Sequence, residues 1–254
     1  MEKRKYPIEK RNKWKCPEGG GAPLLTMPNI VKPLQGQGCQ PRTILGASVW
    51  DRLRKRTYFL AGYKSEISGV DLSKPGMCHA HELFDVDYKQ GTATFKRCVC
   101  ISPEEHIYFI HSGRMVTLYK RRNPLYSAKK VLDGVENGFK LIHDWNKAHP
   151  KETKLKAYQT LLELLKQEEI ADKVEELIDK YEIEFWGEDT KNMAEWKEWK
   201  LIFGKKEYPT PYENCQAWEE AMKIASKNDT VRKASNPFKG GAYDEISAIL
   251  KNTQ

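Results

Sequence analysis

The stretch from Ala61 to Gly113 constrains the fold most, because it combines a short β-hairpin with many of the side chains that could carry chemistry. Strands are predicted around residues 79–84 and 93–98, with Lys89-Gln90-Gly91 forming the turn between them. Imidazoles and thiolates bind transition metals, and imidazole is also a common general base. The stretch is therefore a candidate metal or acid–base site, although His79 and His81 could instead be hydrogen-bonded histidines at the end of a strand. The candidate side chains are His79, His81, Glu82, Cys98, Cys100, His106 and His111.

Amphipathic helices are predicted on both sides of this stretch. Before it, Ser48 can cap a helix whose apolar face runs from Trp50 to Leu60, and Gly62 ends that helix. After it, apolar residues recur at helical spacing in three segments, 131–145, 154–166 and 169–181. The pattern does not decide between strand and short helix for residues 107–110 and 115–119.

We therefore predict an α+β fold, in which a small β-hairpin and helix module precedes a mostly helical C-terminal region. Residues 1–40 are basic and rich in proline and glycine, so they are predicted to form an extended or poorly ordered arm. The module is placed at residues 41–125 and the helical region at 126–254. Within that region Trp196 and Trp199 share a predicted helix face, which could pack inward or contact a partner.

The charge of the chain favours a polyanionic partner. Its formal net charge is +8 and its pI is near 9.0, so nucleic acid, DNA or RNA, is the expected partner. The candidate nucleic-acid-binding residues form two basic blocks, Arg52, Arg54, Lys55 and Arg56, and then Lys120, Arg121 and Arg122. No apolar run is long enough to cross a bilayer, and the cysteine spacing is not that of a secreted disulfide framework. No membrane partner is expected, and the cytoplasm is the predicted compartment.

Several short motifs occur in an order known from one protein family. Residues 50–54 read Trp-Asp-Arg-Leu-Arg, residues 81–87 read His-Glu-Leu-Phe-Asp-Val-Asp, and His111 is followed by Ser112 and Gly113. This order resembles the HNH (ββα-metal) endonuclease-like proteins of bacteria and phages, over roughly residues 40–185. The resemblance implies a β-hairpin and helix that hold one divalent ion, such as Mg²⁺, Mn²⁺ or Zn²⁺, for phosphodiester hydrolysis.

The same resemblance implies roles for individual side chains. His81 stands where the family has its general base, and His79, Glu82 or Asp87 could support it. The ion is then expected near His106 and His111, with His79 and Cys100 as further candidate ligands.

The chain departs from the family where a structural zinc ion would bind. Ser65 and Ser68 stand in place of a Cys-x-x-Cys pair, and Pro103 stands in place of a later cysteine. Serine hydroxyls are weak zinc ligands, so a structural zinc ion is not expected there. The alternative is a different site in which the thiols of Cys78, Cys98 and Cys100 meet His79 or His106.

The spacing of the last two histidines also argues against a standard site. His106 and His111 are five residues apart, which is about 140° around an α-helix and the opposite faces of a strand. Neither geometry directs both imidazoles at one ion, unless Pro103 and the inserted residues re-route the backbone.

Three functions therefore remain open. The preferred one is nucleic-acid binding by a protein that has lost most of an HNH-like nuclease activity. The second is an active metal-dependent endonuclease with a rebuilt site. The third is a phage-type interaction module that binds a host protein through the tryptophan-rich C-terminal region.

Overall fold

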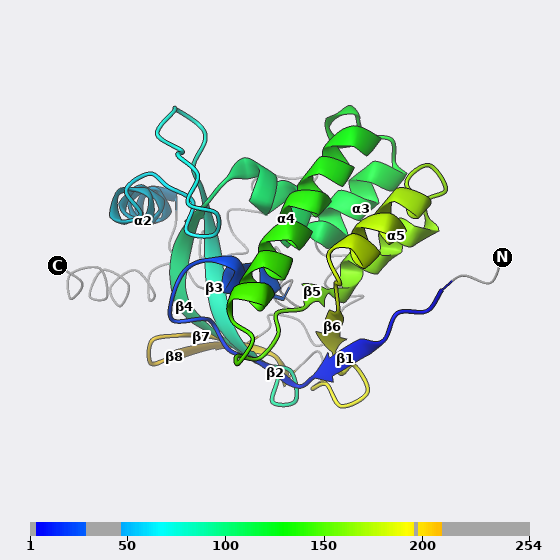
Figure 1. Cartoon of the computed structure of the whole chain (residues 1–254). Coiled ribbons are helices and arrows are strands. Elements are labelled where there is room, and N and C mark those ends of the chain that lie inside the picture. Colours follow the sequence, from blue (N-terminus) through cyan, green and yellow to red (C-terminus); the bar gives the residue numbers. More distant parts are fainter. Residues whose placement is uncertain (1–3, 29–46, 196–197, 210–254) are drawn as a thin grey trace.

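The computed structural model describes residues 4–28, 47–195 and 198–209. It contains both helices and sheets, which confirms the predicted α+β class. The long β-hairpin lies between two sets of helices: α2 (Ala47–Leu60) flanks one side, and α3 (Ser112–Lys120), α4 (Ala128–Ala148) and α5 (Ala171–Lys180) gather on the other (Figure 1). This arrangement brings the hairpin and the following helix together at the candidate site.

The larger sheet has five strands, built around the predicted hairpin. Its order is β2 (Lys13–Trp14), β3 (His79–Asp87), β4 (Thr92–Ile101), β7 (Lys200–Phe203) and β8 (Lys206–Pro209). Strands β3 and β4 are antiparallel, and Gly91 in their turn has φ of 66°, a conformation that glycine adopts readily. The predicted hairpin is thus confirmed, and β7 pairs with β4 in parallel.

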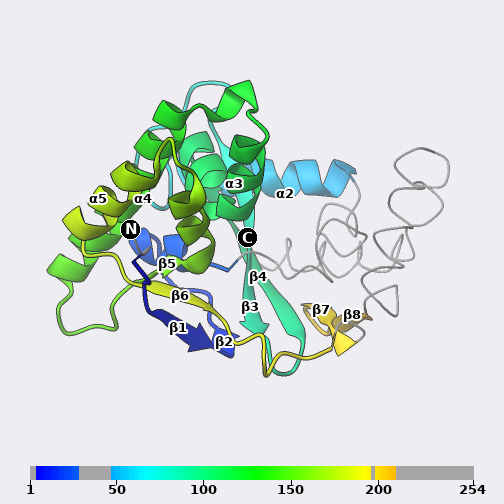
Figure 2. The same ribbon diagram turned by 90° about the vertical axis from the view of Figure 1, so that its right-hand side faces the viewer.

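A second sheet joins segments from both ends of the described chain. Its order is β1 (Ile8–Arg11), β6 (Phe185–Glu188) and β5 (Ala157–Tyr158), all parallel (Figure 2). Residues 8–14, predicted to belong to an arm, therefore form strands in both sheets. Strands therefore pair across the predicted boundaries at residues 40 and 125.

Helices α2, α4 and α5 follow the predicted apolar pattern, but the segment between α4 and α5 does not. Gly62, with φ of 60°, follows α2, as predicted. Helix α4 buries Val131, Val135, Phe139 and Ile142, and α5 buries Val174 and Ile178. The helix predicted over 154–166 is instead strand β5 followed by the 3₁₀ segment η5 (Gln159–Lys166), because residues 157–158 pair with β6. Two further 3₁₀ segments are η1 (Ala22–Thr26) and η4 (Pro124–Tyr126).

The tryptophans serve the core. Trp186 and Trp199 are fully buried, so both side chains pack in the core and neither is available to contact a partner. Trp199 directly precedes strand β7, which corrects the predicted helix at this point. Trp196 and residues 210–254, the last part of the predicted helical region, lie outside the described residues.

Candidate metal centre

A π-helical turn connects the hairpin to helix α3. Segment η3 (Glu105–Ile110) is π-helical, and the backbone N–H of His111 donates to the carbonyl oxygen of His106 at 3.0 Å. A bond to the fifth residue back places these two histidines one turn apart, on the same side of the helix. The two imidazoles therefore do not diverge as a regular helix or strand would make them, because the backbone is re-routed through a π-turn, which is the exception that the sequence left open.

Local hydrogen bonds fix where this helix starts. The backbone N–H of Glu105 donates to Ser102 Oγ at 3.1 Å, and the backbone N–H of Ser102 donates to Glu105 Oε2 at 2.7 Å. These reciprocal bonds are a capping box, and Pro103 occupies the first helical position, where a missing N–H costs nothing. The helix that carries the histidines thus begins at a position set by the sequence.

Two glycines of α4 allow the π-turn to approach closely. A Cβ atom at Gly134 would lie 2.3 Å from Tyr108 Cβ, and one at Gly138 would lie 2.0 Å from Phe109 Cδ2. Contacts that short do not occur between real atoms, so a Cβ at either position would force the side chains or backbone of the π-turn to shift. Because the glycines are four residues apart, they form one flat face of the helix against which the π-turn packs.

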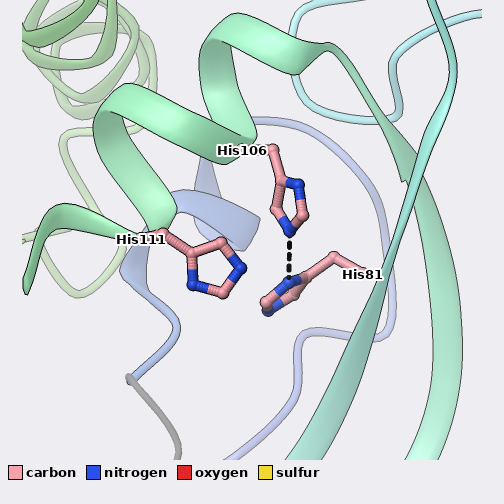
Figure 3. Close-up of side chains that lie close together, drawn as sticks. All are labelled: His81, His106 and His111. Carbon is pink, nitrogen blue, oxygen red and sulfur yellow. Dashed lines mark hydrogen bonds between the residues drawn. The ribbon is translucent and has the colours of Figure 1, made fainter. Parts of the chain in front are cut away.

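Three histidines meet between the π-turn and strand β3. His81 extends from β3, while His106 and His111 come from the helical side (Figure 3). One nitrogen of each ring lies within 4.8 Å of the others, and His81 Nδ1 is 3.2 Å from His106 Nε2. Tetrahedral zinc with imidazole ligands separates its nitrogens by about 3.3 Å. This group, the histidine trio hereafter, could hold a metal ion.

The surroundings keep the trio uncharged at neutral pH. Burial lowers the pKa of His81 to about 3, that of His106 to about 2 and that of His111 to about 4. Repulsion from neighbouring positive charges is the next cause. The other histidines lower the pKa of His106 further, and Arg114 lowers that of His111. A neutral imidazole has a free lone pair, so all three rings are in the state that binds a metal ion.

His79 lies outside the trio but contacts it. Its Nδ1 atom is 2.9 Å from Nδ1 of His106, and His79 is half-buried. If His106 uses Nε2 toward an ion, its Nδ1 carries the hydrogen and donates to His79. Such outer partners orient a ligand and fix its tautomer. The structure therefore places His79, a predicted ligand, as a hydrogen-bond partner of His106.

Glu82 and Cys100 lie on the other face of the hairpin. Cys100 pairs with Ala80, and Glu82 pairs with Cys98, so all four side chains alternate away from His81. Burial raises the pKa of Glu82 to about 7, while burial and the adjacent Cys78 thiol raise that of Cys100 to about 12. Their predicted roles at this site do not fit their placement. Within residues 4–28, 47–195 and 198–209, the histidine trio is the one ligand cluster with metal-binding spacing.

The serine pair is part of a hydrogen-bonded loop against the hairpin. Ser65 Oγ donates to Glu105 Oε2 at 2.6 Å and accepts from the backbone N–H of Ile67 at 3.1 Å. The backbone N–H of Glu66 donates to the carbonyl oxygen of Cys100 at 2.8 Å. Ser65, at a position where the resemblance would place a zinc ligand, therefore bonds the carboxylate that caps the π-turn.

The two predicted basic blocks lie on different sides of the hairpin. Helix α2 packs on the face away from the trio, with Tyr58 beside Cys100 (Figure 1). Arg54 is paired with Asp51, as is Lys55 at 2.6 Å, so part of this block is neutralised. Arg52 and Arg56 belong to the same helix.

Asp87, which was expected to support His81, lies at the far end of β3 and is paired with Lys13 at 2.8 Å.

The second block follows the helix that leaves the trio. Lys120 is paired with Glu163 at 3.4 Å, while Arg121 and Arg122 are exposed and form no ion pair in the part of the chain that the structure describes. Sequence reasoning missed Arg114, which is exposed, is likewise unpaired among those residues, and acts electrostatically on His106 and His111. Arg114 follows His111 by three residues, so a helix over these residues places the two side chains next to each other, and the sequence could have indicated this.

No known protein family, curated protein or solved structure matches this chain. None of the described helices has the length and apolar character that crossing a membrane requires.

Proposed function

We propose that this protein is a metal-dependent phosphodiester hydrolase that acts on nucleic acid. The observation that carries the proposal is the convergence of His81, His106 and His111, three neutral imidazoles, through a π-turn. Three protein ligands leave a coordination position for water or substrate, which distinguishes catalytic from structural zinc sites. When bound, the ion would lower the pKa of a coordinated water and polarise a phosphoryl oxygen.

The ligand chemistry favours zinc or a similar transition metal. Imidazole nitrogen suits Zn²⁺ and Co²⁺, whereas Mg²⁺ prefers carboxylate and carbonyl oxygens. The cluster holds three imidazoles and no carboxylate. Of the ions expected from the sequence, Zn²⁺ is therefore the proposed one, and Mg²⁺ is the least suited.

The charge next to the trio favours a phosphate-bearing substrate. Arg114 is exposed and has no acidic partner among the described residues, so its guanidinium is available for a phosphate oxygen. Helix α3 is about 14 Å long at 1.5 Å per residue and leads from the trio to Arg121 and Arg122. These arginines can contact further phosphates of a polynucleotide, so DNA or RNA is the proposed partner.

The positions of the histidines change the role expected for His81 and the preferred function. His81 is assigned as a third ligand rather than as a general base, because its Nδ1 faces His106 Nε2 within the trio. The second predicted function, an active enzyme with a rebuilt site, is preferred over binding alone, because neutral imidazoles with this spacing are what a metal ion requires. The host-protein alternative has less support, since both described C-terminal tryptophans, Trp186 and Trp199, are buried. The free thiols of the described cysteines agree with the proposed cytoplasmic location.

The proposal is tested with the full chain, stripped with EDTA and reloaded with Zn²⁺ or Mg²⁺. We expect about one Zn²⁺ per chain by elemental analysis, and cleavage of labelled DNA or RNA that Zn²⁺ restores. His111→Ala should abolish both. His143→Ala is the matched control, because His143 lies on α4 and contacts the carbonyl oxygen of Tyr181. Equal cleavage by the His111 variant would contradict the proposal, as would stoichiometric zinc without any cleavage.

A further inference from the structure

Two cysteine thiols meet on the face of the hairpin that points away from the histidine trio. Cys100 in β4 is paired with Ala80 in β3, and Cys78 stands two residues before Ala80. Side chains two residues apart along a strand share a face, so Cys78 and Cys100 are diagonal neighbours. The two thiols lie within hydrogen-bonding distance of each other, and neither is in a disulfide.

The surroundings of Tyr58 show the same convergence of the two thiols. This residue belongs to α2, which packs against β4. Burial is the main cause that raises the pKa of its phenol, and nearby Cys78 and Cys100 add to that rise. Both sulfur atoms act on one phenol only if all three side chains lie close together. The strand register and Tyr58 therefore place the thiol pair at one spot, between the hairpin and α2.

The two thiols differ in their access to solvent. Cys100 is fully buried, and burial together with the Cys78 thiol raises its pKa to about 12, so it stays protonated at neutral pH. Cys78 is half-buried, and its Sγ donates to the carbonyl oxygen of Leu72 at 3.4 Å. Oxidation of cysteine follows exposure and thiolate character, so a dissolved oxidant reacts with Cys78 before Cys100.

We propose that Cys78 and Cys100 are a site of reversible oxidation, at which hydrogen peroxide converts the thiol pair into a disulfide. The sulfur of Cys78 attacks one peroxide oxygen, the O–O bond breaks, and a sulfenic acid and one water form. The sulfur of Cys100 then attacks the sulfur of Cys78. The S–O bond breaks, the S–S bond forms, and the leaving hydroxide takes the proton of Cys100 as a second water. Two thiols and one peroxide thus give one disulfide and two waters.

The disulfide ties the chain just before β3 to the end of β4. Because Cys78 precedes the first pair of the β3–β4 ladder, its backbone can adjust to the geometry that a disulfide requires. Oxidation removes the hydrogen bond from Cys78 to Leu72, and it acts on the backbone directly before His79. A disulfide in a reducing compartment is typically a transient, redox-sensing one. The site lies on the face opposite the trio and does not depend on the proposed hydrolase activity.

The test is peptide mapping of the full chain after oxidation. The reduced protein is treated with hydrogen peroxide at pH 7.5, remaining thiols are blocked, and the protein is digested with trypsin for mass spectrometry. We expect a disulfide between the peptides 65–89 and 98–114, in which fragmentation distinguishes Cys100 from Cys98. Dithiothreitol should release the two peptides. Cys16→Ala is the matched control and should give the same yield, because Cys16 is also half-buried but its Sγ donates to the carbonyl oxygen of Pro17.

Two variants test the order of the two steps. In Cys100→Ala the sulfenic acid at Cys78 has no thiol to react with, so dimedone should trap it. In Cys78→Ala the remaining thiol of Cys100 is buried, so it should stay unlabelled. We expect the labelling of Cys78 to exceed that of Cys100 by about tenfold or more. Circular dichroism checks that each variant is folded, and the mapping of the unmodified sequence needs no variant.

Three results would overturn the proposal. The first is that peroxide produces no bond between Cys78 and Cys100 in the folded chain. The second is a bond from either cysteine to another one, such as Cys98 or the cysteine of a second chain, in place of the expected pair. The third is dimedone labelling of Cys100 in folded Cys78→Ala that equals the labelling of Cys78, which would contradict the assigned order.

Discussion

His111 donates its backbone N–H to the carbonyl oxygen of His106, five residues earlier, and this π-helical geometry brings both imidazoles toward His81. In an α-helix the same two residues would be separated by about 140° around the axis. The trio therefore depends on a local backbone irregularity, and π-turns are found frequently at functional sites.

Gly138→Ala should damage the site from a distance. The new Cβ would lie 2.0 Å from Phe109 Cδ2, so the π-turn must move away from α4. Overpacking of this kind costs about 1–3 kcal/mol of stability, although alanine is the better helix former. We expect a lower melting temperature and loss of stoichiometric zinc binding. Gly19→Ala is the control, because nothing lies within 4 Å of its added Cβ, and equal zinc binding by both variants would refute the packing argument.

His79→Ala should weaken the metal site without removing a ligand. His106 Nδ1 would lose its partner at 2.9 Å, and with it the fixed tautomer. Loss of such a partner typically costs about 10–100-fold in metal affinity. Competition with a zinc chelator measures this loss, while elemental analysis at saturating zinc should still give one ion per chain. A drop in stoichiometry would instead make His79 a direct ligand. His149→Ala, at the end of α4, is the control.

The stability of the metal-free protein should fall as the pH is lowered from 6.5 toward 4. Folding lowers the pKa of His81, His106 and His111 from 6.5 to about 3, 2 and 4, so in this window the unfolded chain binds protons that the folded chain does not. Stability therefore rises with pH between these values. Glu82 opposes this trend, because its pKa is raised from 4.5 to about 7, but it is one group against three.

Urea unfolding at pH 7.5 and pH 5.0 measures this dependence. We expect the free energy of unfolding to be lower at pH 5.0, and the difference to shrink in His111→Gln, which removes one of the titrating groups. A free energy of unfolding that is unchanged or higher at pH 5.0 would show that the trio is not buried in its neutral form.

Arg114→Gln should impair cleavage while leaving the metal in place. The variant loses a charge-assisted hydrogen bond to phosphate, worth about 1.5–3 kcal/mol, which is roughly 10–100-fold in kcat/KM. The salt dependence of nucleic-acid binding should also weaken by about one phosphate contact. Lys129→Gln is the control, since Lys129 is paired with Asp133 on α4. Unchanged kcat/KM with unchanged zinc content would exclude Arg114 from substrate binding.

Much of the local structure could be predicted from the sequence. The hairpin followed from strand patterning with a glycine turn, and α4 and α5 followed from apolar residues at helical spacing. These elements are determined by neighbouring residues, so a local pattern suffices. The histidines and cysteines of the hairpin could also be identified from the sequence as candidate ligands. That His81 and Cys100 lie on opposite faces of the hairpin followed only from the register of its two strands.

The parts that were missed depend on contacts between distant residues. The π-turn requires Gly134 and Gly138, which lie more than twenty residues after it and meet it only in the folded chain. Strand β1 pairs with β6, from the far side of the described chain, and no local pattern in residues 8–11 indicates that pairing. The position of Arg114 beside the trio likewise follows from the helix geometry after His111.

X-ray absorption spectroscopy of the zinc-loaded protein tests the central claim most directly. The proposed function predicts one zinc ion with three imidazole ligands, which the histidine trio would supply, at about 2.0–2.1 Å and no sulfur at about 2.3 Å. The imidazole signal should fall to two ligands, or the zinc should be lost, in His81→Ala. A spectrum with sulfur ligands would place the metal at Cys78 and Cys100 on the other face of the hairpin, and together with an unchanged spectrum of His81→Ala it would contradict the histidine centre.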